Sequence, residues 1–416
     1  MTHSADRGAA SEEPGSGAAT AIFQQRGFRQ YWLSQLCAIF AAQMQSVAIG
    51  WQVYEMTQRP LDLGFVGLAQ FLPVCVLALV AGQVADRYDR SRVLLGCLAL
   101  QMLCAVALLS LTLVGNTQVA LIFGVLGLTG AARAFEFPAS ASLLPNLVPA
   151  EQFVRAAALT SSARQSASII GPALGGLLYA VSPGIVYGSC VALLLVAALQ
   201  IAVIRLRVVG GDRKAVTWES VVAGVAFIRG HPVVLGAISL DLFAVLLGGT
   251  TALLPIFARD ILHVGPWGLG LLRSAPAVGA LGMAAFLAYR PIRSNMGTTL
   301  FLTVAVFGLA TIGFALSEHL WLSMGMLVVL GASDMVSVVI RRVVVQVSTP
   351  DEMRGRVSAV ESVFIGASNE LGEFESGVTA AWFGVVPAAL IGGIGTLMIV
   401  GVWSWLFPHL RRVNAL

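Results

Sequence analysis

Twelve apolar stretches divide this chain, and each is long enough to cross a membrane as a helix. About 20 apolar residues span the hydrocarbon core. The stretches cover residues 31–54, 63–84, 93–114, 118–138, 156–180, 184–205, 233–256, 266–288, 297–316, 319–341, 356–384 and 387–408. Charged residues make up 11% of the chain, against about 25% in soluble domains, so a water-facing surface cannot be covered. We therefore expect an all-α integral membrane protein with twelve transmembrane helices.

Positive charges alternate along the polar breaks between these stretches. Nearly all Arg and Lys side chains fall in every second break, and the other breaks hold only Arg59 and Arg259. Because positively charged loops stay on the cytoplasmic side, the bias predicts that both termini are cytoplasmic. Residues 1–25 are polar and have no apolar core before a cleavage site, so we expect a disordered tail and not a signal peptide.

The two halves of the chain repeat each other. A shift of about 201 positions pairs residues of the fifth and eleventh stretches, and a shift of about 203 pairs the second with the eighth. The pairs are Pro149 with Pro350, Glu151 with Glu352, Arg155 with Arg356, Gly171 with Gly372, Gly176 with Gly377, Gly67 with Gly270, Gln70 with Arg273 and Pro73 with Pro276. Two six-helix halves with pseudo-symmetry are typical of transporters that rock one half against the other.

We therefore expect a tail at 1–27, a first half at 28–206, a linker at 207–232, a second half at 233–410 and a tail at 411–416. In the linker, apolar residues recur at helical spacing at Trp218, Val221, Val222, Val225 and Ile228. This spacing predicts a short amphipathic helix on the cytoplasmic membrane surface. The alternative is an ordinary start of the seventh helix.

The break after the second stretch reads Gly82-Gln-Val-Ala-Asp86-Arg87-Tyr-Asp89-Arg90-Ser-Arg92. It resembles the G-x-x-x-D-R-x-x-R-[RK] loop of the major facilitator superfamily. A carboxylate here can pair with arginines and accept from helix N-termini. By this resemblance Gly82, Asp86, Arg87 and Arg90 form a gating loop that latches the two halves. The second-half copy has Tyr289 where the Asp would be, so the latch is expected to be asymmetric.

The fifth stretch contains Gly171-Pro172-Ala173-Leu174-Gly175-Gly176. It resembles the core of the antiporter motif of exporters in this superfamily, with Ala167 at the position of one upstream glycine. Small residues allow helices to approach closely and proline can kink them, so a packing role and a coupling role are both open. Further strings, among them Leu144-Pro145-Asn146-Leu147-Val148 and Thr349-Pro350-Asp351-Glu352-Met353-Arg354, resemble the drug and siderophore exporter branch.

That resemblance implies export powered by proton entry, with no cofactor, in the cytoplasmic (inner) membrane of a bacterium. The expected partners are a small-molecule substrate and the lipid bilayer, not nucleic acid, and we expect a monomer.

Ionisable side chains inside the apolar stretches are candidate functional residues, because such groups are costly in a bilayer. Arg133 and Glu136 lie three residues apart on one helix face and can neutralise each other. Asp241 has no basic residue one turn away, so it needs a partner from another helix or a proton. It is the first candidate for a proton carrier. Asp334 and Arg341, seven residues apart, also share a face.

The eleventh stretch carries Glu361, Glu370, Glu373 and Glu375, and its first-half counterpart is apolar at three of these positions. Glu370 and Glu373 share a face, where two like charges are expected to share one proton. They are the second candidate for coupling, while Glu361 and Glu375 can equally be solvated. By the resemblance, the first, fourth, seventh and tenth helices line a central cavity. Its candidates are Gln43, Gln45, Arg133, Glu136, Asp241 and Asp334.

Proton-driven export of small amphipathic molecules is the function these features favour. An importer on the same fold and a non-transporting membrane sensor remain open alternatives. An enzyme is disfavoured because the five histidines are scattered and form no metal-ligand spacing. ATP hydrolysis is excluded because the only lysine, Lys214, follows no glycine-rich phosphate loop.

Overall fold

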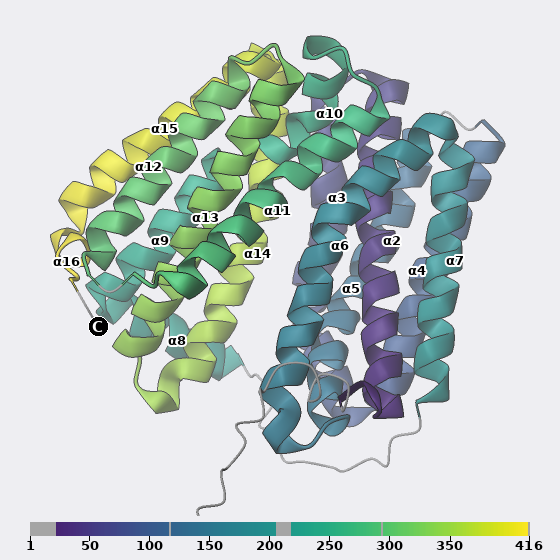
Figure 1. Ribbon diagram of the computed structural model, residues 1–416, viewed down its shortest axis with the longest axis horizontal. Helices are drawn as coiled ribbons and strands as arrows, with labels where there is room; N and C mark the ends of the chain where they lie inside the picture. Colours follow the sequence, from purple (N-terminus) through teal and green to yellow (C-terminus); the bar gives the residue numbers. More distant parts are fainter. Residues whose placement is uncertain (1–21, 116–117, 205–217, 293, 415–416) are drawn as a thin grey trace, which may run out of the picture.

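The computed structural model describes residues 22–115, 118–204, 218–292 and 294–414, and every regular element in these ranges is a helix (Figure 1). The first part contains α2 (Arg26–Thr57), α3 (Pro60–Arg87), α4 (Arg90–Leu113), α5 (Val119–Leu143), η1 (Leu144–Asn146), η2 (Ala150–Gln152), α6 (Phe153–Val181) and α7 (Pro183–Val203). The linker contains α8 (Trp218–Gly230). The second part contains α9 (Pro232–Leu247), η3 (Thr250–Leu253), α10 (Leu254–Ile256), η4 (Phe257–Ile261), α11 (Pro266–Tyr289), α12 (Met296–Ala315), α13 (Leu320–Ser348), α14 (Asp351–Phe383), α15 (Val385–Leu406) and α16 (Pro408–Arg411). Most of the expected N-terminal tail and the linker up to residue 217 lie outside the described residues.

Ten helices in the described ranges are long and apolar enough to cross a membrane. Helices α6 and α14 have spanning length too, at 29 and 33 residues, but they are more polar. Within α14, Glu370, Glu373 and Glu375 lie close together. The all-α membrane architecture is confirmed, and the order of the helices is consistent with twelve crossings.

The seventh apolar stretch does not form the single helix expected over 233–256. Helix α9 ends at Leu247, and Gly248 and Gly249 separate it from η3, α10 and the π-helical turn η4. A Cβ added at Gly249 would come within 2.6 Å of the backbone of Gly372 in α14. The break therefore lies where the backbone of α14 approaches Gly249, and only a residue without a Cβ permits so close an approach.

The linker helix α8 packs on protein over part of its surface. Its Ile228 is buried in a cluster with Val357 and Val360 of α14, and Val225 packs against the same cluster. A Cβ added at Gly224 would lie 2.9 Å from the carbonyl oxygen of Arg356. A helix lies where the spacing predicts one, and one of its faces packs on α14. Its position on the membrane surface remains a prediction.

Two bundles of helices meet along two crossings. Helices α2 to α7 pack among themselves, as do α9 and α11 to α16, while α3 packs on α14 and α6 packs on α11 (Figure 1). The bundles converge at the end opposite α8, which we call the far end, and diverge toward the α8 end (Figure 1). At the far end, a Cβ on Gly377 would lie 2.8 Å from Cα of Gly64, and one on Gly176 would lie 3.0 Å from Cα of Gly270.

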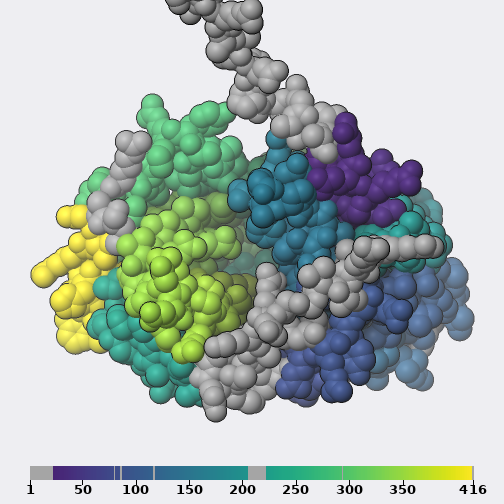
Figure 2. Space-filling model, turned by 90° about the horizontal axis from the view of Figure 1, so that it is seen from below, coloured from purple at the N-terminus to yellow at the C-terminus, as the bar shows by residue number. Residues whose placement is uncertain are grey.

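The α8 end is hollowed between the bundles. Viewed from this end, the surface recedes between the green helices of the second half and the blue N-terminal half of α6 (Figure 2). Arg59 caps the start of α3 and Arg259 lies in η4, and both elements reach the far end (Figure 1). The two exceptions to the charge alternation therefore share the end opposite α8.

Candidate functional site

Two glutamates of α14 lie against the backbone of α3 at the crossing between the halves. A Cβ added at Gly67 would stand 3.0 Å from Oε2 of Glu373 and 3.2 Å from Oε2 of Glu370. Thr251 of η3 donates from its hydroxyl to Oε1 of Glu373 at 3.2 Å. The two carboxylates expected to share a helix face therefore do lie together, and they face the opposite half of the protein.

Two arginines from different halves balance this acidic pair. Arg133 of α5 and Arg273 of α11 both interact electrostatically with Glu370, and Arg273 also interacts with Glu373. Arg133 donates to Oε1 of Gln70 at 2.9 Å. Arg273 donates to the hydroxyl of Ser46 in α2. Buried charges need such compensation to be tolerated, and here it ties the two halves together.

Arg273 was not among the candidates chosen from the sequence. The repeat pairs Arg273 with Gln70, which accepts from Arg133, the other arginine that interacts with Glu370. Proximity to two glutamates on a helix about 100 residues later in the chain cannot be read from spacing.

Asp241 has a partner from another helix, which was one of its two expected states. Its carboxylate pairs with Nη1 of Arg341 in α13, and Nε of Arg341 lies 3.2 Å from Oε1 of Glu361 in α14. The Arg341 side chain is only 3% exposed. The three side chains carry two negative charges and one positive charge when all are ionised. Glu361 is thus part of a triad whose other two members are buried.

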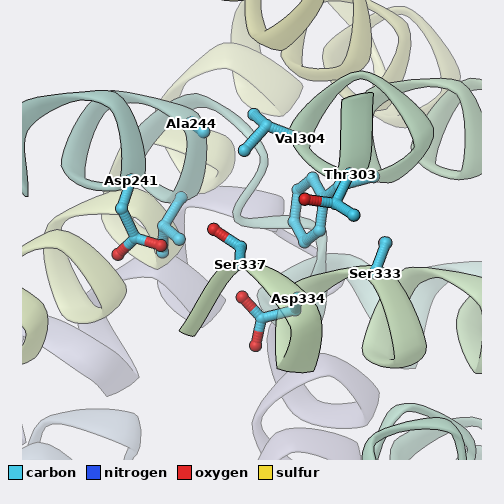
Figure 3. A pocket seen from close by; sticks show the side chains of 9 residues that line it. Asp241, Ala244, Thr303, Val304, Ser333, Asp334 and Ser337 are labelled. Atoms are coloured by element: carbon cyan, nitrogen blue, oxygen red, sulfur yellow. The ribbon is translucent and has the colours of Figure 1, made fainter. Parts of the chain in front are cut away.

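Asp334 and Arg341 lie seven residues apart on α13, but they form no ion pair, because Arg341 turns to Asp241 and Glu361 instead. Asp334 lines a small pocket with Asp241, Ser333 and Ser337, and Figure 3 shows the two aspartates on either side of Ser337. Among the described residues Asp334 has no hydrogen-bond or ion-pair partner. It also lines a cavity of about 460 Å³ that Gln165 and Ser168 of α6 complete from the other half, with Glu373.

Arg133 and Glu136 do not neutralise each other as expected. Arg133 turns to Gln70, while Glu136 accepts from Nε2 of Gln101 in α4 at 2.6 Å. Both line a second cavity of about 330 Å³ inside the first half, together with Gln43 of α2. Their separation gives each a polar partner and leaves both beside open space.

The two glutamines of α2 have different surroundings. Nε2 of Gln43 donates to the hydroxyl of Ser168 at 3.3 Å. Gln45 is buried away from the first-half cavity, and its Nε2 has no acceptor among the described residues. Only Gln43 therefore borders the cavity as expected.

The gating loop is bound within the first half. Arg90 donates to the carbonyl of Ser142 at 3.1 Å, and Asp89 caps α4 by accepting from the backbone of Ser91. Arg87 is exposed, Gly82 has open space beside it, and the side chain of Asp86 lies outside the described residues. Within the described ranges no hydrogen bond or ion pair joins this loop to the second half.

The Gly171–Gly176 motif of the fifth apolar stretch lies in α6, where it packs this helix against two neighbours at once. A Cβ at Gly171 would lie 2.7 Å from Cβ of Gln43, and one at Gly175 would lie 2.7 Å from Cα of Met44, both in α2. On the other side Gly176 faces Pro266, and the carbonyl of Pro172 lies 2.5 Å from the position of a Cβ on Gly270. This geometry favours the packing role among the two left open.

A polar contact also joins the halves at the far end. The hydroxyl of Tyr54 in α2 donates to Asp260 of η4, and the guanidinium of Arg259 lies over the Tyr54 ring, 5.8 Å from its centroid. The distance suits a cation–π interaction. Sequence reasoning missed this contact, since Arg259 was noted only as an exception to the charge pattern.

Comparison with known proteins agrees with this architecture. The family described as transmembrane secretion effector (MFS_3) matches residues 17–416. The chain is 27% identical to multidrug efflux pump Tap of Mycolicibacterium fortuitum, over 88% of this chain and 92% of that protein. It is 26% identical to enterobactin exporter EntS of Citrobacter koseri, over 92% of each. It is also 27% identical to macrolide efflux protein A of Streptococcus pyogenes, but that alignment spans 61% of this chain and 64% of that protein.

Solved structures share the fold at low identity. A crystal structure of nucleoside transporter NupG superposes with a TM-score of 0.71 at 14% identity, over 92% of this chain and 99% of that one. A bacterial homolog of the lysosomal transporter Spinster, inward-facing and unoccupied, gives a TM-score of 0.70 at 13% identity, over 96% and 98%. The matched family spans nearly the whole chain and the fold is that of these transporters. The chain therefore belongs to the transmembrane secretion effector family of major facilitator superfamily transporters.

Proposed function

We propose that this transporter exports small amphipathic molecules from the cytoplasm in exchange for protons. The observation that carries the proposal is the Glu370–Glu373 pair, set against Gly67 where the two halves cross. Two carboxylates this close cannot both ionise cheaply, so the pair is suited to hold a shared proton. A proton gained or lost there changes the attraction of α14 for Arg133 and Arg273, which belong to opposite halves.

Alternating access fits the way the halves meet. Helices cross at glycines at the far end and leave a hollow at the α8 end. The charge alternation assigns the α8 end to the cytoplasm. The proposal places the cargo in the cavity that Asp334 and Glu373 line, with entry from the hollow at the α8 end. Efflux relatives at low identity support export as the direction.

The names of the relatives suggest which cargoes to test first. Macrolide efflux protein A and enterobactin exporter EntS are named for a macrolide and for a siderophore. Both are amphipathic compounds, which suits a cavity that places Asp334 and Glu373 beside apolar walls such as Phe307 and Leu330.

Transport into inside-out proteoliposomes under an imposed pH gradient tests the proposal. A macrolide and a catecholate siderophore serve as cargoes, and Asp241→Asn and Glu373→Gln are measured beside the parent. We expect uphill transport by the parent, its loss in Glu373→Gln, and retained cargo exchange in that variant. If Asp241 carries the proton instead, Asp241→Asn abolishes uphill transport and Glu373→Gln does not.

Accumulation that depends on the opposite gradient would instead identify an importer. Absence of any transport by the parent, with both cargoes and in both directions, would favour the sensor.

A further inference from the structure

The small pocket that Asp241 and Asp334 share lies between α9, α12 and α13 in the second half. Its volume is about 10 Å³, which is close to the least room that one water molecule or one small ion needs. Its polar lining consists of Asp241, Thr303, Ser333, Asp334 and Ser337. Asp334 also lines the larger cavity of about 460 Å³, so this carboxylate borders both spaces.

Ser337 presents an unpartnered hydroxyl to this pocket. The residue is 4% exposed, and its Oγ has no hydrogen-bond partner among the described residues. A serine inside a helix commonly donates to a backbone carbonyl of the preceding turn, as Ser333 does to Leu330 at 2.8 Å. Figure 3 shows Ser337 between the carboxylates of Asp241 and Asp334. A buried hydroxyl without a protein partner points to a bound water or ion.

The lining offers the pocket many acceptors and few donors. The hydroxyl protons of Thr303 and Ser333 go to backbone carbonyls of their own helices, at 3.0 and 2.8 Å, so these side chains have only oxygen lone pairs to offer. Ionised carboxylates are acceptors alone. The hydroxyl proton of Ser337 is the single donor left among the polar side chains of the lining. An oxygen-lined space of this kind suits a hard cation.

The formal charges around the pocket favour a cation over a water molecule. Asp241 and Asp334 line the pocket, and Glu361 adjoins it through Arg341. Among the described residues Arg341 is the only cation paired with any of these three carboxylates. Arg342 interacts with Arg341 but is exposed. Excess negative charge inside a membrane protein is costly, and a neutral water molecule cannot offset it.

We propose that this pocket binds Na⁺, with Asp334 and Ser337 as ligands and with further oxygens from Asp241 and Thr303. A single unpartnered carboxylate matches a monovalent ion, because divalent ions usually take several carboxylates. The small volume leaves no room for an organic ammonium group and suits Na⁺ better than the larger K⁺. The ion joins α9, α12 and α13. This inference goes beyond the proposed function, since it depends neither on the direction of transport nor on the group that carries the proton.

Equilibrium binding of radiolabelled Na⁺ tests the proposal. The full-length protein is placed in nanodiscs of zwitterionic lipid at neutral pH, without a gradient. Choline chloride keeps the ionic strength constant, and empty nanodiscs give the background. We expect saturable binding of one Na⁺ per chain, which unlabelled Na⁺ displaces, K⁺ displaces only at higher concentration, and choline does not displace.

Variants then locate the site. Asp334→Asn should abolish saturable binding because it removes the unpartnered charge, and Ser337→Ala should raise the Kd several-fold because it removes one neutral ligand. Glu375→Gln is the control for the carboxylate, since it lies on α14 outside the pocket. Ser323→Ala is the control for the hydroxyl, because Ser323 is buried on the same helix but bonds to Ser317 at 3.0 Å. Both controls should bind Na⁺ as the parent does.

The proposal is overturned if the parent shows no saturable binding, because water or a proton then fills the pocket, or if K⁺ displaces Na⁺ as readily as unlabelled Na⁺ does. Binding that Asp334→Asn retains also overturns it, and loss of that binding in Glu370→Gln would place the ion at the α3–α14 crossing. If circular dichroism shows that Asp334→Asn does not fold, an unchanged Kd in Ser337→Ala decides against the site. A failure of export leaves all these results unchanged, since no transport is measured.

Discussion

The two crossings between the halves are related by the internal repeat, yet they are built from different chemistry. At the α6–α11 crossing, Gly270 meets Pro172 and Gly176, and Gln165 donates to the carbonyl of Ala277 at 3.1 Å, so the contact is uncharged. At the α3–α14 crossing, Gly67 is equivalent to Gly270, but it meets Glu370 and Glu373. The same backbone geometry thus supports a neutral contact on one side and an ionisable contact on the other.

This difference suggests a division of labour. A neutral, tightly packed crossing has the same strength whatever the proton concentration, so α6–α11 can act as a pivot. The α3–α14 crossing changes its charge when a proton binds, so it can favour one tilt of the halves over the other. Proton binding and the movement of the halves are then coupled, because the protonation state of this crossing shifts the equilibrium between the two tilts.

The largest expected effect comes from filling the neutral crossing. Gly270→Ala places a Cβ 2.5 Å from the Pro172 carbonyl, and we expect a loss of stability of roughly 1–3 kcal/mol, typical of overpacking. Gly64→Ala, whose nearest contact on α14 is 3.1 Å, should lose less. Thermal unfolding in detergent measures both.

Gly188→Ala is the control for this pair, since nothing lies within 4 Å of its Cβ position. It should be neutral, or stabilising by up to about 1 kcal/mol through helix propensity. Equal losses at Gly270 and Gly64 would show that the two crossings are equally tight and would remove the argument for a single pivot.

A smaller effect, confined to transport, is expected at the ionisable crossing. Glu370→Gln should slow export driven by a pH gradient roughly tenfold or more. A tenfold change is the equivalent of about one unit of difference between the pKa values of the acidic pair in the two tilts of the halves, and the substitution removes that difference. Initial rates in proteoliposomes with and without the gradient provide the measurement.

Glu375→Gln is the matched control for the acidic pair. Glu375 lies on the same helix but is not one of the two glutamates next to Gly67. It accepts from the hydroxyl of Thr379, one turn further along α14, at 2.7 Å. An equal loss of gradient-driven rate in both variants would assign the effect to the overall charge of α14 and not to the crossing.

The sequence allowed the helices, the repeat and the acidic pair to be predicted, because each depends on local spacing or on self-comparison. Glu370 and Glu373 share a face wherever a helix forms. By contrast, the sequence offered Arg133 and Arg341 only acidic neighbours on their own helices, Glu136 and Asp334, and their partners in the structure are others. In a bundle, buried charges find their partners on other helices, and that choice depends on packing that one sequence does not reveal.

The break after α9 shows the same limit. Gly248 and Gly249 are visible in the sequence, but glycines are common in membrane helices and do not by themselves predict a break. The reason lies at Gly372, whose backbone approaches Gly249 across the bundle. The gating loop remains a prediction: the side chain of Asp86 is outside the described residues, and the halves are separated where a latch would form.

The smallest expected effect concerns the far end, where Tyr54 and Asp260 join the halves outside both crossings. Tyr54→Phe removes one hydrogen bond, with a net contribution of about 1 kcal/mol, and should let the far end open several-fold more often. Hydrogen exchange of residues 250–262 measures this opening. Tyr187→Phe removes a comparable bond, 2.6 Å to Gln52, but within the first half, so it should leave that exchange unchanged. If both variants accelerate exchange equally, Tyr54 does not hold the halves together, and closure of the far end depends on the two crossings and on other contacts such as Arg273 with Ser46.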